Sequence, residues 1–204
     1  MKTIIQIILG VVIILLGYLL VDSIMKPINF NRVKNKRYEA TIERLKDIRK
    51  AQVAYKSRYG RYTGSFDTLI DFVRSDSLKV VKAIGVTPDT LTEKQALEKG
   101  IIIRDTTKVS VFDSLFFDGY PLDSLRYVPY VAPAQFQMGA GIIKTESEVD
   151  VNVFEAAVHN NVLLKGLDKQ LIINLNKKWE DITGFPGLKV GSLEKATNND
   201  GNWK

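Results

Sequence analysis

The residue types that carry most enzyme chemistry are scarce in this chain of 204 residues. Cysteine is absent, which excludes a disulfide, a thiolate metal site and a cysteine nucleophile. His159 is the single histidine, so a metal site with two histidine ligands cannot form, and a catalytic triad would have to use this residue. Because His159 follows an apolar, alternating run and precedes two asparagines, we predict that it is a turn residue.

Glycine-containing motifs give no stronger signal. Gly139-Ala140-Gly141 lacks the third glycine of a dinucleotide site and the Gly-Lys-Ser/Thr ending of a P-loop. No Gly-x-Ser-x-Gly sequence marks a serine nucleophile. We therefore predict a flexible hairpin turn at 139–141 and name no catalytic, cofactor-binding or metal-binding residue. Whether the chain is an enzyme stays open, with a non-enzyme favoured.

The triplet Asp-Ser-Leu occurs three times, at 76–78, 113–115 and 123–125. In one interpretation, each triplet is a turn in which the Asp or Ser side chain bonds the nearby backbone. In the other, the three carboxylates converge on a calcium ion, but the glycine and closely spaced oxygen ligands of a calcium loop are missing. The turn interpretation is favoured.

The N-terminal segment predicts a membrane anchor. From Ile4 to Val21 the chain carries no charge, and as a helix this run would be about 27 Å long, which matches a bilayer core. We expect residues 1–25 to form the anchor of a single-pass protein of the cell inner membrane. A cleaved signal peptide is the alternative, with Lys2 as its basic start and a cleavage site near Asp22.

A basic stretch follows the anchor. Pro27 predicts the end of the first helix, and residues 26–37 read as a juxtamembrane linker. We expect five of its residues to contact lipid headgroups: Lys26, Arg32, Lys34, Lys36 and Arg37. These charges place the domain in the cytoplasm by the positive-inside rule, but large domains translocate regardless of charge, so the side stays open. Nucleic acid is the less favoured partner for this stretch.

Apolar and large residues then recur every three or four positions, which predicts one stripe along a helix at 36–59. The stripe, which either belongs to the core or binds a partner, comprises Tyr38, Ile42, Leu45, Ile48, Tyr55 and Tyr59, with Tyr62 just beyond it. Gly60 predicts the C-cap of this helix, and Ser65 the N-cap of a shorter helix that packs against it.

The remaining pattern predicts an α+β domain over 38–197 with an antiparallel, β-rich second half. We predict a strand or short helix at 78–84 and a helix at 92–99. Strands at 101–104 and 108–112 would form a hairpin through 105–107. Further strands are predicted at 125–131, 135–138, 142–145, 149–158 and 188–190, a helix at 167–179, and a flexible tail at 198–204.

The first seventy residues resemble type IV pilins and the pseudopilins of type II secretion. The resemblance lies in the apolar first helix, its amphipathic continuation at 42–55, the sequence Tyr59-Gly60-Arg61-Tyr62 and the short helix at 66–72. It implies a pilin-like fold, in which a long helix ends in a turn and a β-sheet follows. The chain is also similar to uncharacterised single-span membrane proteins of the Bacteroidota.

Two functions are therefore expected. The first is a membrane-anchored, non-enzymatic scaffold or assembly component of an envelope complex, bound to protein partners or to copies of itself. The second is a membrane-tethered ligand-binding or enzymatic domain whose site is dispersed along the sequence, with His159 or the triplet acids as contributors.

Overall fold

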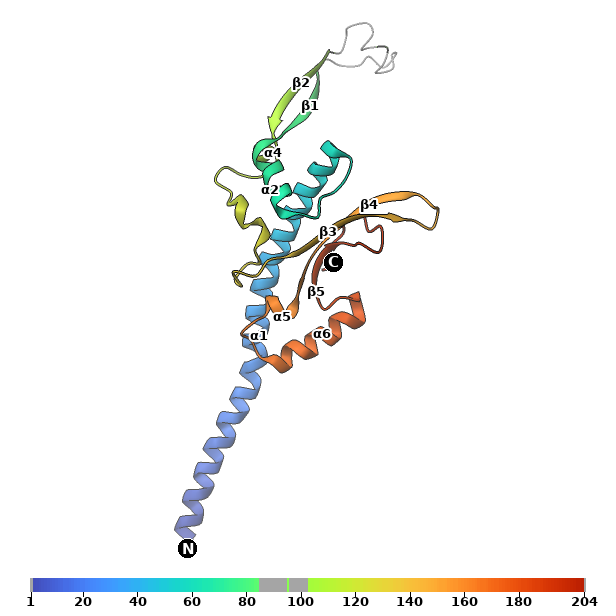
Figure 1. Cartoon of the computed structure of the whole chain (residues 1–204). Helices are drawn as coiled ribbons and strands as arrows, with labels where there is room; N and C mark the ends of the chain where they lie inside the picture. The colour runs from blue at the N-terminus through green and yellow to red at the C-terminus, as the bar shows by residue number, and fades with distance from the viewer. Residues whose placement is uncertain (1, 85–94, 96–102, 204) are drawn as a thin grey trace.

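The computed structural model describes residues 2–84, 95 and 103–203 and has an α+β architecture (Figure 1). A long helix carries two small antiparallel sheets and several short helices. The elements are α1 (Lys2–Tyr59), α2 (Phe66–Ser75), β1 (Ser77–Ile84), β2 (Ile103–Ser110), α4 (Val111–Leu115), the 3-10 helix η1 (Leu122–Arg126), β3 (Gln137–Lys144), β4 (Asp150–His159), α5 (Asn160–Leu163), α6 (Lys169–Thr183) and β5 (Gly187–Gly191).

Helix α1 is continuous through Pro27, so the prediction that this proline ends the first helix is wrong. Proline forfeits one backbone hydrogen bond, but the turns after it are supported in other ways. Arg32 donates to the Asn29 side chain at 3.2 Å, and Phe30 is buried in the core. Residues 26–37 therefore extend the helix, which at 58 residues is about 87 Å long.

The predicted end of α1 and the start of α2 are confirmed. Gly60 follows α1 with φ of 73°, a left-handed conformation that favours glycine. The Ser65 hydroxyl accepts a hydrogen bond from the Thr68 N–H and caps α2. Helix α2 packs on the end of α1, where the rings of Tyr55 and Phe72 meet edge to face with centroids 5.2 Å apart.

Strands β1 and β2 pair with each other, from Ser77 opposite Ser110 to Ile84 opposite Ile103. The predicted hairpin through 105–107 is wrong, because β2 runs through these residues and 111–115 form α4. Thr106 and Thr107 are good strand formers, and the pairing with β1 outweighs their turn-like context. The helix predicted at 92–99 lies outside the described residues, apart from Gln95.

The second sheet has the strand order β3-β4-β5, with both pairs antiparallel. The strands predicted at 149–158 and 188–190 and the helix at 167–179 are confirmed with small shifts of their ends. The two predicted strands on either side of 139–141 form one strand, so the expected turn there is wrong. Gly139 fits because a Cβ would come within 2.9 Å of the Leu193 side chain. Residues 125–131 contain the end of η1 and a turn rather than a strand.

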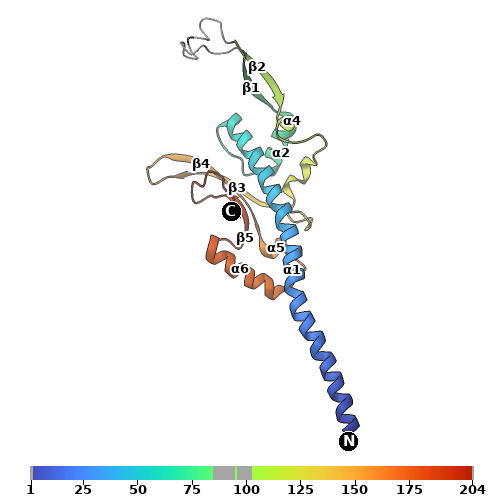
Figure 2. The ribbon, with the colours of Figure 1, turned by 180° about the vertical axis from the view of Figure 1, so that it is seen from behind.

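The sheet lies against the middle of α1, and the core forms between them (Figures 1 and 2). Leu45 and Ile48 of α1 are fully buried, as are Phe154, Leu188 and Val190 of the sheet. At about 25 cal/mol per Å² of apolar surface, residues of this size each contribute roughly 1.5–3 kcal/mol. The N-terminal part of α1 projects away from this core in both views.

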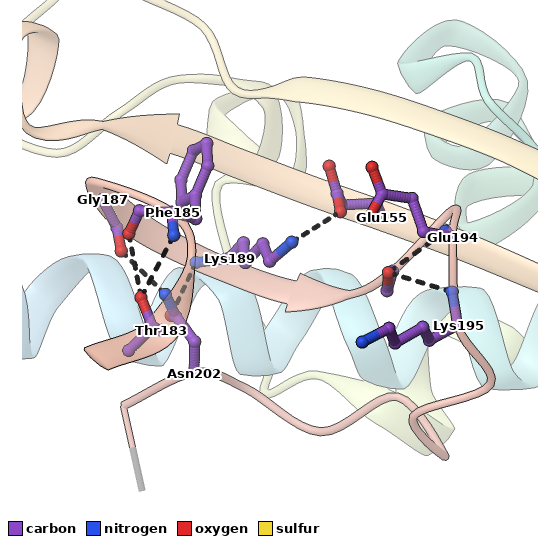
Figure 3. A network of polar contacts seen from close by, with 9 residues as sticks. Glu155, Thr183, Phe185, Gly187, Lys189, Glu194, Lys195 and Asn202 are labelled. Atoms are coloured by element: carbon purple, nitrogen blue, oxygen red, sulfur yellow. Dashed lines mark hydrogen bonds and ion pairs between the residues drawn. The ribbon is translucent and has the colours of Figure 1, made fainter. Parts of the chain in front are cut away.

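The C-terminal residues line the free side of β5, although the sequence predicted a flexible tail at 198–204. The Asn202 side chain accepts from the Lys189 N–H at 2.9 Å and donates to the Gly187 carbonyl, as Figure 3 shows. On the same strand, the Lys189 ammonium lies 3.1 Å from the Glu155 carboxylate. Asn199 also donates to the Tyr62 hydroxyl at 2.8 Å, so the tail joins β5 to the loop that follows α1.

Candidate functional site

The first third of α1 is an exposed apolar surface. Every large apolar side chain from Ile4 to Val21 is at least 40% exposed, so the domain covers none of this segment. By length and composition the segment could span a membrane, and a signal sequence would meet the same criteria. Exposed apolar area on this scale requires an apolar environment or a partner.

Along α1, the side chains change from exposed to buried over about two turns of helix. Phe30 is the first buried residue of the helix, and Tyr38 is the next large one. Below them, the segment Gly166–Asp168 between α5 and α6 lies beside α1 at the base of the domain (Figure 1). Nothing in the sequence predicted that this segment lies beside α1.

A groove of about 300 Å³ separates α1 from this segment, and we call it the basal groove. It is lined by Asp22, Met25, Lys26, Asn29, Phe30, Val33, Gly166, Leu167 and Asp168. The Lys26 ammonium lies 2.6 Å from the Asp22 carboxylate, one turn before it on α1. A hydrogen bond with Asp22, together with the charges of Asp22 and Asp168, raises the pKa of Lys26. Asp168 also caps α6, since its carboxylate accepts from the Leu171 N–H at 3.0 Å.

The five bases expected at lipid headgroups have different environments, and together we call them the basic collar: Lys26, Arg32, Lys34, Lys36 and Arg37. Arg32 donates to the exposed side chain of Asn29. The Lys36 ammonium lies over the Tyr130 ring, 5.4 Å from its centroid. Burial, followed by the charge of Lys178 on α6, lowers the pKa of Lys34. Lys34 and Lys178 are therefore close enough to repel each other, which favours an anion beside them.

Arg37 has a structural role that the sequence did not indicate. Its guanidinium donates to the carbonyl of Leu163 at 2.9 Å and to that of Lys165 at 3.0 Å. These carbonyls follow α5, where the chain turns towards α6. Arg37 therefore fixes the segment that forms one wall of the basal groove, and its charge is directed at the protein instead of the solvent.

The predicted stripe is mostly turned towards the protein's own domain. Tyr38, Leu45, Ile48, Tyr55 and Tyr62 are buried, Ile42 is half-buried, and Tyr59 is 51% exposed. Gln52, between Ile48 and Tyr55, is also fully buried and bonds both the N–H and the carbonyl of Thr63. The structure thus directs the stripe at different neighbours: Tyr38 meets Trp179 of α6, Tyr55 meets Phe72 of α2, and Tyr62 meets Phe154 of β4.

His159 is the N-cap of α5, and its Nδ1 accepts from the Asn161 N–H at 3.0 Å. The prediction of a turn residue is wrong, because His159 is the last residue of β4, paired with Gly187, and α5 begins at the next residue. Each triplet bonds the nearby backbone, as predicted: the Ser77 N–H donates to the Asp76 side chain, the Ser114 hydroxyl to the Ser110 carbonyl, and the Ser124 hydroxyl to the Pro121 carbonyl. Only the first marks the start of a strand, because residues 113–115 lie in α4 and 123–125 in η1. Within the described ranges, no three His, Cys, Asp or Glu side chains are placed to hold a metal ion.

Comparisons with protein-family models, with curated protein sequences and with solved structures return no match for this chain.

Proposed function

We propose that this chain is a single-pass membrane protein whose domain is a non-enzymatic scaffold, an assembly component of an envelope complex. In this proposal, the exposed apolar part of α1 lies in the inner membrane, and Lys26, the first base of the basic collar, lies at the headgroups. The α+β domain then binds partner proteins or further copies of the chain. The long helix packed on an antiparallel sheet supports a pilin-like role of this kind.

The continuity of α1 is the observation that carries the proposal. The same helix is exposed and apolar from Ile4 to Val21 and then supplies the buried residues Leu45 and Ile48 to the core. A rigid helix shared by an anchor and a core holds the domain at a fixed height and angle above the bilayer. Fixed presentation suits a scaffold, whereas a flexible linker would suit a freely reaching domain.

One experiment tests the anchor, and a second determines the side of the membrane on which the domain lies. After alkaline carbonate extraction of membranes, we expect the full chain to stay in the pellet at its full length. A chain released into the supernatant, or shortened by cleavage near Asp22, would contradict the proposal. Reporters active on opposite sides of the membrane, fused after Lys204, then establish on which side the domain lies.

The scaffold role is tested by crosslinking in intact cells. Because the chain contains no cysteine, single cysteines can be introduced on the domain surface without a background reaction. We expect adducts with specific partner proteins or with a second copy of the chain. An anchored chain that yields only monomer at every surface position would overturn the scaffold proposal while leaving the anchor intact.

A further inference from the structure

The basal groove has a charge opposite to that of its surroundings. Two carboxylates, Asp22 and Asp168, and one ammonium, Lys26, face it, which gives a net charge of −1. Bases adjoin its lining residues along the chain: Arg32 and Lys34 flank Val33 on α1, and Lys169 follows Asp168. An acidic groove inside a basic rim matches a ligand that carries a positive and a negative group side by side.

The groove lies where lipid headgroups would be. With residues 4–21 in the bilayer core, Asp22 is at the boundary, and Asn29 is about 10 Å further along the helix axis. The headgroup region on each side of a bilayer is about 5–8 Å thick. Asp22 and Lys26, which is about 6 Å further along the axis than Asp22, therefore fall within this region.

The floor of the groove is apolar and continues towards the membrane. Phe30, Val33 and Leu167 line it together with Met25, which is 44% exposed. One turn below Met25 lies Val21, which belongs to the exposed apolar surface of α1. An acyl chain can follow this surface while the headgroup occupies the groove.

We propose that the basal groove binds a phospholipid whose zwitterionic headgroup carries a primary ammonium. The ammonium donates hydrogen bonds to Asp22 and Asp168, the phosphate faces Lys26 and the basic rim, and the acyl chains lie along α1. This proposal rests on the membrane anchor proposed above. It assigns the groove to one class of lipid instead of to the membrane surface in general.

The chemistry of the groove distinguishes this class from other phospholipids. A choline headgroup has a quaternary ammonium without an N–H, so it cannot donate to either carboxylate. A glycerol headgroup leaves a net negative charge facing two carboxylates. A primary ammonium satisfies both carboxylates and retains the attraction between phosphate and basic rim.

The test uses the full chain in bilayers that contain equal amounts of phosphatidylethanolamine and phosphatidylcholine. Lipids retained by the protein are counted by native mass spectrometry. We expect a roughly two- to fivefold preference for phosphatidylethanolamine, the range that an exposed charge pair contributes. The preference should fall with each N-methyl group added to the ethanolamine, since each replaces a hydrogen-bond donor.

Asp168→Asn is the informative variant. Asparagine is as good an N-cap as aspartate, so α6 keeps its cap while the groove loses a negative charge. We expect this variant to lose most of the preference. Asp181→Asn is the matched control, because it makes the same change at an exposed position on the same helix, and it should keep the preference.

The outcomes separate this inference from the proposed function. A chain that stays in the membrane pellet but shows no headgroup preference, or whose preference survives Asp168→Asn, overturns the groove assignment alone. A preference for phosphatidylglycerol overturns it too, because the basic collar would then determine lipid binding. A chain that is extracted by carbonate refutes the anchor, on which the inference depends.

Discussion

The Tyr38 hydroxyl on α1 donates a hydrogen bond of 2.5 Å to the side-chain oxygen of Asn160 on α5. Both side chains are buried, and Trp179 of α6 packs edge to face on the Tyr38 ring with centroids 5.7 Å apart. Tyr38 therefore joins α1, α5 and α6 at the base of the domain. This contact fixes the position of α6 relative to the anchor helix.

Replacement of Tyr38 by phenylalanine tests this contact. Tyr38→Phe leaves the Asn160 oxygen buried without its donor, and we expect the free energy of unfolding to fall by about 1–3 kcal/mol. The measurement is urea unfolding of the full chain in detergent, followed by tryptophan fluorescence. Tyr59→Phe is the control, because it removes a hydroxyl that bonds Asp76 on the surface and should cost clearly less than Tyr38→Phe. Equal losses would contradict the structural role of Tyr38.

The same residue makes the domain sensitive to high pH. Burial raises the pKa of the Tyr38 phenol, against the smaller opposite effect of its hydrogen bond with Asn160. The unfolded chain loses this proton near pH 10, whereas the folded chain retains it. The stability that neutral Tyr38 contributes is therefore fully present below about pH 10 and is lost as pH rises towards the folded pKa.

Above about pH 10, we expect the free energy of unfolding to decrease with pH in both proteins. The slope should be steeper in wild type than in Tyr38→Phe, by about 1.4 kcal/mol per pH unit. Burial raises the pKa of Tyr120 as well, so a residual slope should remain in the variant. Urea unfolding at two alkaline pH values checks this difference. Parallel slopes would show that Tyr38 ionises equally in both states.

Local patterns in the sequence predicted the elements whose signals lie within a few residues. Ser65 and Gly60 marked helix ends, the alternation after Val149 marked β4, and the stripe from Tyr38 to Tyr59 marked the buried side of α1. Caps, alternation and helical periodicity are determined by neighbours in the chain, which is why they could be predicted.

The errors occurred where distant partners outweigh local preference. Gly139 looks like a turn residue, but it lies in β3 opposite Glu155, with Leu193 in the space its side chain would need. Pro27 looks like a helix end, but the helix continues past it and places Phe30 in the core. Such contacts have no local signature in the sequence.

The sequence predicted the five bases of the basic collar, but not that they have different contacts with the domain. Arg37 bonds carbonyls that follow it by 126 and 128 residues, and Asp168 comes to the groove from another element. A single sequence contains no sign of these approaches. The anchor segment was predictable because its apolar length alone distinguishes it.

Arg37 and Arg32 provide a test that separates folding from lipid contact. Lysine keeps the charge but cannot reproduce the forked guanidinium contact with two carbonyls. We expect Arg37→Lys to lower the free energy of unfolding by about 1–3 kcal/mol and Arg32→Lys to change it by less than about 0.5 kcal/mol. Urea unfolding measures both. If the two variants are equally stable, Arg37 does not hold the wall of the basal groove.

Two glycines of the second sheet give the last prediction. A Cβ at Gly187 would lie 2.2 Å from the Val158 carbonyl oxygen on the paired strand β4, and 2.9 Å from the His159 Cα. Backbone atoms of a central strand cannot move aside without breaking the pairing with β5. We expect Gly187→Ala to destabilise the domain by at least about 3 kcal/mol.

Gly141→Ala is its matched control, because Gly141 lies within β3 and a Cβ there would meet no atom within 4 Å. Alanine also reduces the conformational freedom of the unfolded chain, so this variant should be neutral or more stable by up to about 1 kcal/mol. Thermal unfolding followed by circular dichroism measures both variants. If Gly141 were in a hairpin turn that needs a left-handed conformation, Gly141→Ala would be destabilising, so the same pair of variants tests whether β3 is continuous.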